Sequence, residues 1–294
     1  MSIIGPKSRH RHITYNICLW LTVVFLTGFH LDAEASRQKV TIPAPQSVLD
    51  TRYVYLVEIL NKSMLRTVDT HGPYELIEIE KSVSETRGIK ELENNTGLIN
   101  LLWSSTSTIK EAKLRAIRIP IYKGMLGYRL LLTVSGQLEA LKGVRSLADI
   151  RRFIVGQGHS WGDITVYQHH KIDVVTSPNY EGLFKMLLQR RFDIFPRGLT
   201  EIYTEHDARK NFLPDLTIEP SLYIYYPWPY YFFTSMDDER LAARINIGLE
   251  RMIETGEYDS VFFKHYLSSL KRARLKQRRV IELTNPMLPK ATPL

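Results

Sequence analysis

The segments YRLLLTV, at residues 128–134, and YYFFT, at residues 230–234, decide how this chain folds. Each is an apolar run with aromatic or β-branched residues, a composition that favours a buried extended strand. The chain between them is long enough for a complete small α/β unit, and further α/β elements lie on both sides. We therefore expect the chain to leave one α/β lobe, build a second and return, so that the two crossings form a hinge.

Strand and helix patterns alternate before the first crossing. Strands are predicted at residues 39–43, 74–80 and 98–103, and a polar helix is predicted at 84–94. The helix between the first two strands has an apolar stripe at i, i+3, i+4, i+7 and i+11, formed by Tyr53, Leu56, Val57, Leu60 and Met64. This β-α-β-α-β order implies a parallel sheet with helices on both faces.

The same alternation continues between the crossings. Ser146 opens a short helix with capping-box spacing, and Ser177 and Pro178 are the predicted N-cap and first residue of a longer one. Strands are predicted beside these helices, at residues 153–155, 172–176 and 192–195. After the second crossing a further helix is expected, and the apolar segment 280–289 is expected to pack back as a terminal strap.

The N-terminal segment has the pattern of an export signal. Three basic residues precede an uncharged apolar run at residues 17–29, which at about 13 residues is shorter than the ~20 needed to cross a bilayer. Small residues at Ala33 and Ala35 predict cleavage that leaves Ser36 first, with an uncleaved anchor as the alternative. Cys18, the only cysteine, lies inside the run, so the mature chain can form no disulfide or thiolate metal site.

Composition and the two crossings predict the domain organisation. Residues 1–35 form the signal peptide, residues 36–132 together with 229–294 form the first lobe, and residues 133–228 form the second. The net charge of +8 falls to +7 without the signal. Export excludes nucleic acid as a partner, so the positive charge reflects an anionic ligand, an anionic membrane surface or solubility alone.

Four further segments carry a family resemblance. They are LINLLWSSTSTIKEAKLRAIRIPIY at 98–122, GQGHSWGD at 156–163, NYEGLFKMLLQRRFDIFPRG at 179–198 and ETGEYDSVFFKHY at 254–266. In this order and spacing the chain resembles the family 3 extracytoplasmic solute-binding proteins of the amino-acid-binding type. The resemblance covers nearly the whole mature chain. It implies the type II fold: two α/β lobes, each a mostly parallel sheet flanked by helices, with two hinge strands.

Two departures from the family pattern bear on the ligand. The first-lobe loop of such proteins usually carries an arginine that holds the ligand's carboxylate, and here Lys110 takes that place. An ammonium holds a carboxylate only as a point charge, without the bidentate fork. The strand that usually delivers an acidic residue for the ligand's amino group ends here in Pro196 and Arg197. Two cationic groups favour an anionic ligand such as a dicarboxylate over an α-amino acid.

The candidate binding residues follow strands whose carboxyl ends meet between the lobes. They are Trp103, Ser105, Thr106, Lys110, Tyr122, Gln157, Gly158, His159, Ser160 and Arg197. The glycine turn at 156–160 precedes a helix, whose N-terminal amides would attract an anion. Alternative roles stay open: core packing for Trp103 and Tyr122, helix capping for the serines, and a salt bridge with Glu201 for Arg197. Asp50, Arg52 and Tyr53 are expected at the cleft mouth or as helix caps.

The predicted function is that of a monomeric periplasmic receptor that closes on a small, anionic solute, an amino acid or organic acid, for uptake through a membrane permease. The alternatives are a ligand sensor that reports to a membrane signalling partner and a dehydratase-like enzyme on the same fold. His159, Glu111 and Glu181 are candidate general acids, but they form no recognisable catalytic constellation. No cofactor and no metal is expected, because adjacent His169 and His170 lack a third ligand at suitable spacing.

Overall fold

The computed structural model describes residues 1–2, 5, 37–45, 50, 52–290 and 292. Most of the predicted signal peptide, with its cleavage site, lies outside the described residues. Residues 37–294 form one compact unit. Within the described part of the chain, no helix is both long and apolar enough to cross a membrane.

The first lobe is built on a sheet of order β3-β11-β4, with β1 and β2 as a separate pair. Its elements are β1 (Gln38–Ile42), α2 (Arg52–Leu65), α3 (Val68–His71), β2 (Tyr74–Glu78), α4 (Glu85–Glu93), β3 (Leu102–Ser105), α5 (Thr108–Glu111), β4 (Leu114–Ile117), β11 (Tyr230–Ser235), α11 (Glu239–Glu254) and α12 (Glu257–Ala273). The β1–β2 pair is parallel, as the alternating pattern predicts, whereas β11 runs antiparallel to both β3 and β4.

The second lobe is built on a sheet of order β12-β10-β5-β8, with β9 also paired to β5, and on the parallel pair β6–β7. Its elements are β5 (Tyr128–Val134), α6 (Leu138–Lys142), α7 (Leu147–Ile150), β6 (Val155–Gly158), α8 (Asp163–His169), β7 (Val174–Ser177), α9 (Tyr180–Leu188), β8 (Phe195–Gly198), α10 (Ile202–Asp207), β9 (Leu216–Ile218), β10 (Leu222–Tyr225) and β12 (Arg279–Glu282).

The two predicted hinge segments are both strands, and each belongs to one lobe. Strand β5 pairs with β8, β9 and β10 of the second lobe, and β11 pairs with β3 and β4 of the first. The chain therefore crosses between the lobes just before each strand, at residues 118–127 and 226–229. The lobe boundaries at residues 132 and 229 stay predictions, but these pairings place all of β5 with the second lobe.

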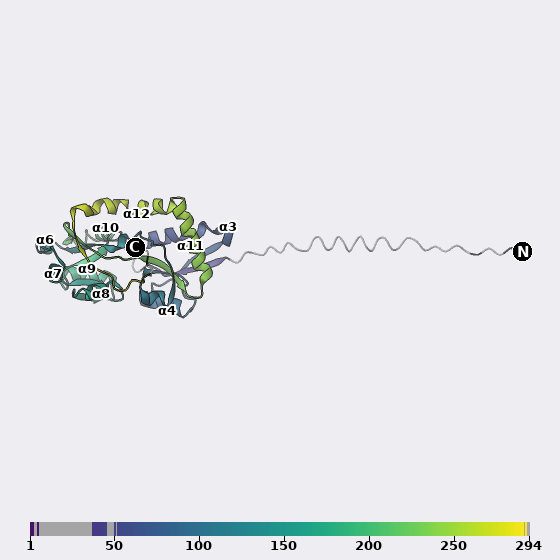
Figure 1. The fold of residues 1–294 in the computed structure, drawn as a ribbon, viewed down its shortest axis with the longest axis horizontal. Coiled ribbons are helices and arrows are strands. Elements are labelled where there is room, and N and C mark those ends of the chain that lie inside the picture. Colours follow the sequence, from purple (N-terminus) through teal and green to yellow (C-terminus); the bar gives the residue numbers. More distant parts are fainter. Residues whose placement is uncertain (3–4, 6–36, 46–49, 51, 291, 293–294) are drawn as a thin grey trace. The chain divides into compact units, whose positions relative to one another are not determined.

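Helix α12 and the C-terminal strap also connect the lobes. Tyr258 and Tyr266 of α12 pack in the core that contains α2, whereas Ala273 at its end packs in the second-lobe core. Figure 1 shows α12 running along the edge of the fold past both groups of helices. The strap continues from β12, and the backbone N–H of Thr108 donates to the carbonyl of Met287 at 2.9 Å.

Two local predictions are wrong: the glycine turn after residue 155 and the N-cap of α9. Strand β6 begins at Val155 and includes both glycines predicted for the turn. Position 156 requires glycine for packing, since a Cβ there would lie 2.3 Å from the Phe192 ring. The N-cap of α9 is Asn179, whose Oδ1 accepts from the N–H of Gly182 at 2.8 Å. Ser177 is instead the last residue of β7. The capping box at Ser146 is confirmed.

Candidate functional site

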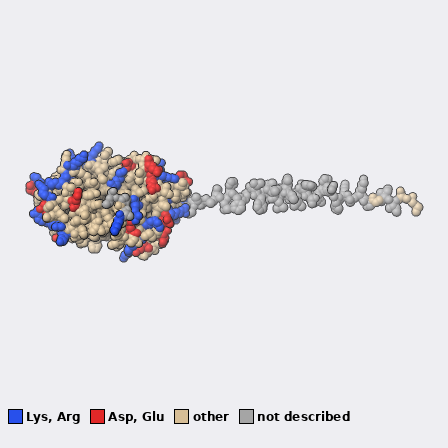
Figure 2. Space-filling view, in the orientation of Figure 1, with Lys and Arg blue, Asp and Glu red and all other residues tan. Residues whose placement is uncertain are grey.

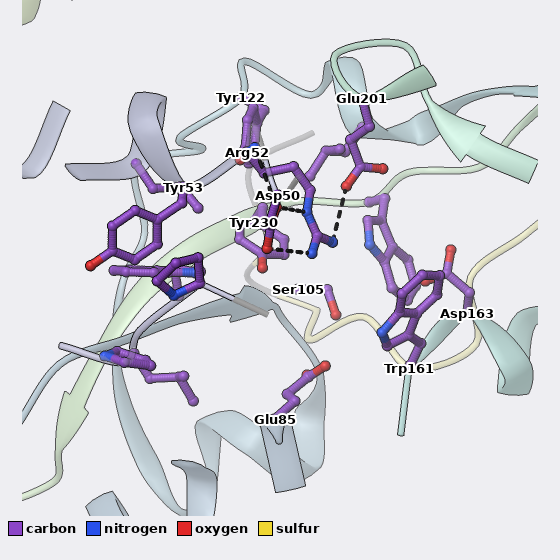
Figure 3. A pocket seen from close by; sticks show the side chains of 18 of the residues that line it. Asp50, Arg52, Tyr53, Glu85, Ser105, Tyr122, Trp161, Asp163, Glu201 and Tyr230 are labelled. Carbon is purple, nitrogen blue, oxygen red and sulfur yellow. Dashed lines mark hydrogen bonds and ion pairs between the residues drawn. The ribbon is translucent and has the colours of Figure 1, made fainter. Parts of the chain in front are cut away.

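A cavity of about 110 Å³ lies between the lobes, and both lobes contribute to its lining. Helix α2 and the ends of β1 and β3 supply the first-lobe wall, while the start of α8, the end of β8 and β5 supply the opposite wall. The carboxyl ends of β1, β3 and β8 point at this space, as the rule for open α/β sheets requires. Figure 3 shows the side chains that converge there.

The lining carries opposite charges in nearly equal number. Its ionisable side chains other than tyrosine are Arg52, Arg129, Arg197, Asp50, Glu85, Asp163 and Glu201. On the face of the molecule drawn in Figure 2, basic and acidic side chains are interspersed. The net positive charge of the chain is therefore not reproduced at the cavity, where four carboxylates outnumber three guanidinium groups.

Arg197 lies at the cavity as predicted, and two carboxylates pair with the Nε and Nη2 groups of its guanidinium. Its Nε and Nη2 donate to Glu205 at 2.7 Å each, and Nη2 lies 3.1 Å from Glu201. The group also lies 4.6 Å from the centre of the Trp161 ring. Burial alone would lower the pKa of Arg197, but the two carboxylates outweigh it and raise that pKa. A ligand contact at Arg197 stays a prediction, and a ligand there would have to bind a guanidinium that is already paired with Glu205 and Glu201.

Lys110 lies behind the cavity lining. Its ammonium contacts Glu85, and it donates to Ser104 Oγ at 2.7 Å and to the Ser105 carbonyl at 2.8 Å. These acceptors hold the cation within the first lobe, and Lys110 is not one of the residues lining the cavity. The geometry therefore gives no support to the expectation that Lys110 and Arg197 present two uncompensated charges to an anionic ligand.

Arg129 is the cavity cation that the sequence analysis missed. It lies on β5 and is only 3 % exposed, and its guanidinium lies 5.3 Å from the centre of the Tyr226 ring and 5.4 Å from that of the Trp228 ring. Its Nη2 contacts Asp163 at 2.8 Å, Nη1 lies 3.9 Å from Glu201, and Nε has no acceptor among the described residues. Because a guanidinium has five N–H donors, Arg129 keeps more unused donor capacity than Arg197.

Arg52 joins the two lobes at the edge of the cavity. It begins α2 and forms a bidentate pair with Asp50, at 2.7 and 2.9 Å. Its Nη1 lies 3.7 Å from Glu201 of the second lobe, and its guanidinium lies 4.9 Å from the centre of the Tyr180 ring. Figure 3 shows Arg52 between Asp50 and Glu201. The predicted place of Asp50 and Arg52 at the cleft agrees with this arrangement.

Aromatic rings form the apolar part of the wall. Trp103 and Tyr122 line the cavity as predicted, together with Tyr53, Tyr230, Trp161 and Trp228. Tyr122 is also a core residue, since its ring contacts those of Tyr55, Tyr230 and Tyr266. Burial raises the pKa of Tyr122 well above its ordinary value. Tyr122 therefore packs in the core and also lines the cavity, while contact of Trp103 or Tyr122 with a ligand stays a prediction.

The other predicted residues lie outside the cavity lining, except Ser105. Thr106 donates to Glu111 at 2.5 Å, and Gln157 is buried with neither amide atom paired among the described residues. His159 and Ser160 line a separate hollow. Gly158 serves packing there, because a Cβ would lie 2.4 Å from the Trp161 indole. Their ligand-binding roles stay predictions.

The described residues contain no group of three or more His, Cys, Asp or Glu side chains placed to hold a metal ion. The rings of His169 and His170 lie 5.0 Å apart and perpendicular, so they do not face a common point. The Nε2 of His170 contacts Thr284 of the C-terminal strap, at 3.0 Å from both its backbone nitrogen and its carbonyl. That contact gives this histidine a structural role.

Comparison with solved structures identifies the class of fold. An ancestral arginine-binding protein bound to arginine superposes with a TM-score of 0.58 at 16% identity, over 78% of this chain and 98% of that one. A periplasmic binding protein of Salmonella typhimurium with high arginine specificity gives 0.56 at 16% identity, over 78% and 99%. An ancestral amino-acid-binding protein described as a precursor of cyclohexadienyl dehydratase gives 0.55 at 14% identity, over 79% and 96%.

The chain therefore has the two-lobed fold of periplasmic binding proteins, as the sequence predicts. No protein-family model and no curated protein sequence matches it. At this level of identity the likeness establishes the fold, and the function must be argued from the site.

Proposed function

We propose that this protein is a periplasmic receptor that closes its two lobes on a small solute and delivers it to a membrane permease. The observation that carries the proposal is the interlobe cavity, which combines an aromatic wall with the polar groups of Arg129 and Ser105. Ligand sites are concave and largely apolar, with a few placed polar groups that fix orientation. The fold supplies the hinge that such closure requires.

The charge balance of the cavity favours a dipolar solute over a dianion. Every lining arginine already has a carboxylate partner, so a second negative group on the ligand would meet Asp163 or Glu201 without a compensating cation. A zwitterion can place its acceptor end toward Arg129 and Ser105 and its cationic end toward a carboxylate such as Glu85. The proposed solute is therefore an amino acid or a similarly small dipolar compound, consistent with the named ligands of the structural neighbours.

The export pattern of residues 1–35 supports the periplasmic location. Binding rather than turnover is proposed because the carboxylates beside Arg129 are paired with other groups of the protein. Tyr226 donates to Asp163, and Asp163 is paired with Arg129. Neither carboxylate beside Arg129 is therefore left as an unpartnered acid or base for proton transfer.

Titration calorimetry against a panel of amino acids, organic acids and short peptides tests the proposal. We expect saturable binding by at least one dipolar member and weaker or no binding by dicarboxylates of similar size. NMR of the bound compound should show it unchanged over hours. Absence of binding across the whole panel would overturn the receptor function, and conversion of the compound would replace it with an enzymatic one.

A further inference from the structure

Ser105 presents an unusual hydrogen-bonding environment at the cavity. It ends β3, is 5 % exposed and lines the cavity. Its Oγ accepts from the Lys110 ammonium at 3.2 Å, and its carbonyl accepts from the same ammonium at 2.8 Å. Across the cleft, a Cβ at Gly162 of the second lobe would lie 3.5 Å from this Oγ. The Ser105 hydroxyl therefore lies where the two lobes approach each other.

The chemistry of the ammonium excludes one direction for the Ser105 hydroxyl hydrogen, the one toward Lys110. A lysine ammonium has three N–H donors and no acceptor, so any hydroxyl that contacts it must act as the acceptor. Four acceptors lie near the three N–H groups of Lys110, and the Ser105 Oγ contact at 3.2 Å is the longest of them. Ser105 Oγ therefore accepts a shared hydrogen from Lys110, and its own hydrogen must point elsewhere. Among the described residues no acceptor is recorded for that hydrogen, whereas the neighbouring Ser104 hydroxyl donates to Glu85 at 2.5 Å.

Glu85 keeps Lys110 in this position. Its carboxylate contacts the Lys110 ammonium, and the side chains are 20% and 13% exposed. The backbone N–H of Lys110 donates to the N-cap Ser107 at 3.2 Å, which fixes the start of α5. Figure 3 shows Ser105 and Glu85 on the same side of the site. Lys110 is therefore held both at its backbone N–H and at its ammonium group.

We propose that Lys110 is a positioning residue that acts through Ser105. Held by Glu85, it orients the Ser105 hydroxyl as a fixed hydrogen-bond donor into the cavity, which selects solutes with a carboxylate or carbonyl oxygen at that point. This assignment rests on the proposed receptor function for its biological meaning. It also explains how a lysine in the family's carboxylate-binding loop position can matter without reaching the ligand.

A thiol at position 105 reports on the ammonium without any ligand. In the full chain carrying Cys18→Ser, the variant Ser105→Cys introduces the only cysteine. Burial at position 105 raises the pKa of the thiol, and a cation within hydrogen-bond distance stabilises the thiolate and lowers it. The thiol pKa, measured from the pH dependence of alkylation by iodoacetamide, should therefore be lower with Lys110 present than without it. Adding Lys110→Met should raise that pKa by at least about one unit, and Lys110→Arg should restore much of the difference.

Lys113→Met is the matched control. This lysine follows α5, and its ammonium pairs with Glu93 at 2.9 Å on the exposed surface. We expect it to leave the thiol pKa unchanged. Equal thiol pKa values with Lys110 and with Met at position 110, in variants whose circular dichroism shows a native fold, would overturn the positioning role.

A double-mutant cycle with L-alanine as probe tests the consequence for binding. Ser105→Ala should weaken binding at least tenfold. Adding Lys110→Met to Ser105→Ala should weaken it little further, because both substitutions act on the same hydrogen-bond donor, the Ser105 hydroxyl. Fully additive losses would show that Lys110 acts independently of Ser105 and would overturn the proposal. If L-alanine does not bind at all, that result counts against the proposed function for this probe, and the thiol pKa still decides the role of Lys110.

Discussion

Glu205→Gln should destabilise the protein severely although the change is nearly isosteric. The Glu205 carboxylate is 1% exposed and accepts two hydrogen bonds from Arg197, both at 2.7 Å, and one from Tyr180 at 2.6 Å. Burial alone would raise the pKa of Glu205, but Arg197, together with Arg52 and Tyr180, outweighs it and lowers that pKa. A glutamine retains one acceptor but turns an N–H₂ group toward the guanidinium, so the bidentate pair is lost.

The loss of unfolding free energy arises because the buried Arg197 cation loses one of its two carboxylate partners. Removing one partner of a buried ion pair costs about 3–5 kcal/mol of unfolding free energy. Glu201 still lies 3.1 Å from Arg197, which points to the lower end, about 3 kcal/mol. Asp207→Asn is the control on the same helix: its pair with Arg272 lies on the surface, with side chains 37% and 43% exposed, and should cost about 1 kcal/mol or less.

Urea unfolding at neutral pH, followed by tryptophan fluorescence, measures both variants. Trp161 is a suitable reporter because Arg197 lies on its ring. The expected result is a large fall in the unfolding midpoint for Glu205→Gln and a small one for Asp207→Asn. If the two variants lost equally little, Arg197 would not depend on Glu205, and its assignment as an internally compensated cation would be wrong.

Three other changes have defined outcomes. The pKa of Glu205 is lowered on folding, so the stability that its carboxylate contributes is complete above the unfolded pKa of ~4.3 and is lost as the pH falls through the folded pKa. The difference in melting temperature between the unsubstituted protein and Glu205→Gln should therefore shrink below pH 4. Gly248→Ala should lower the unfolding free energy by about 1–3 kcal/mol or more, measured in urea, because its Cβ would lie 2.0 Å from the Ser63 carbonyl. Arg129→Lys should weaken binding of a panel compound at least tenfold by calorimetry, whereas Arg244→Lys, which removes a buried arginine that does not line the cavity, should leave the affinity unchanged.

Much of the fold was predictable because its signals are local. The apolar stripe of α2, the capping box at Ser146 and the two apolar strands β5 and β11 each depend on residues close in the sequence, and each is present. Strand boundaries in the second lobe were less predictable. Gly156 and Gly158 look like a turn, but they are strand residues that admit the rings of Phe192 and Trp161. That use of glycine depends on partners elsewhere in the chain.

The candidate site was predicted only in part, because the role of a charge depends on what pairs with it. Lys110 was expected to face a ligand, and its partner Glu85 lies 25 residues earlier on another helix. Arg129 was overlooked inside an apolar hinge strand, although a lone arginine in such a run is itself a signal: a charge is buried there only with a partner or a function. Asp163, which supplies the partner, lies in the segment chosen for its glycines.

The paired cleft also sets how solute binding can drive closure. Arg52 of the first lobe already lies 3.7 Å from Glu201 and 4.9 Å from the ring centre of Tyr180, both in the second lobe. The lobes therefore attract each other through their own side chains, and a ligand shifts the open–closed equilibrium only by the difference between the contacts it makes and those it displaces. A solute that displaced the Arg52–Glu201 contact without replacing it would weaken closure. A dipolar solute that bridges Arg129 and Glu85 adds contacts while leaving Arg52 in place, so the same charge pairing that disfavours a dianion favours closure on a zwitterion.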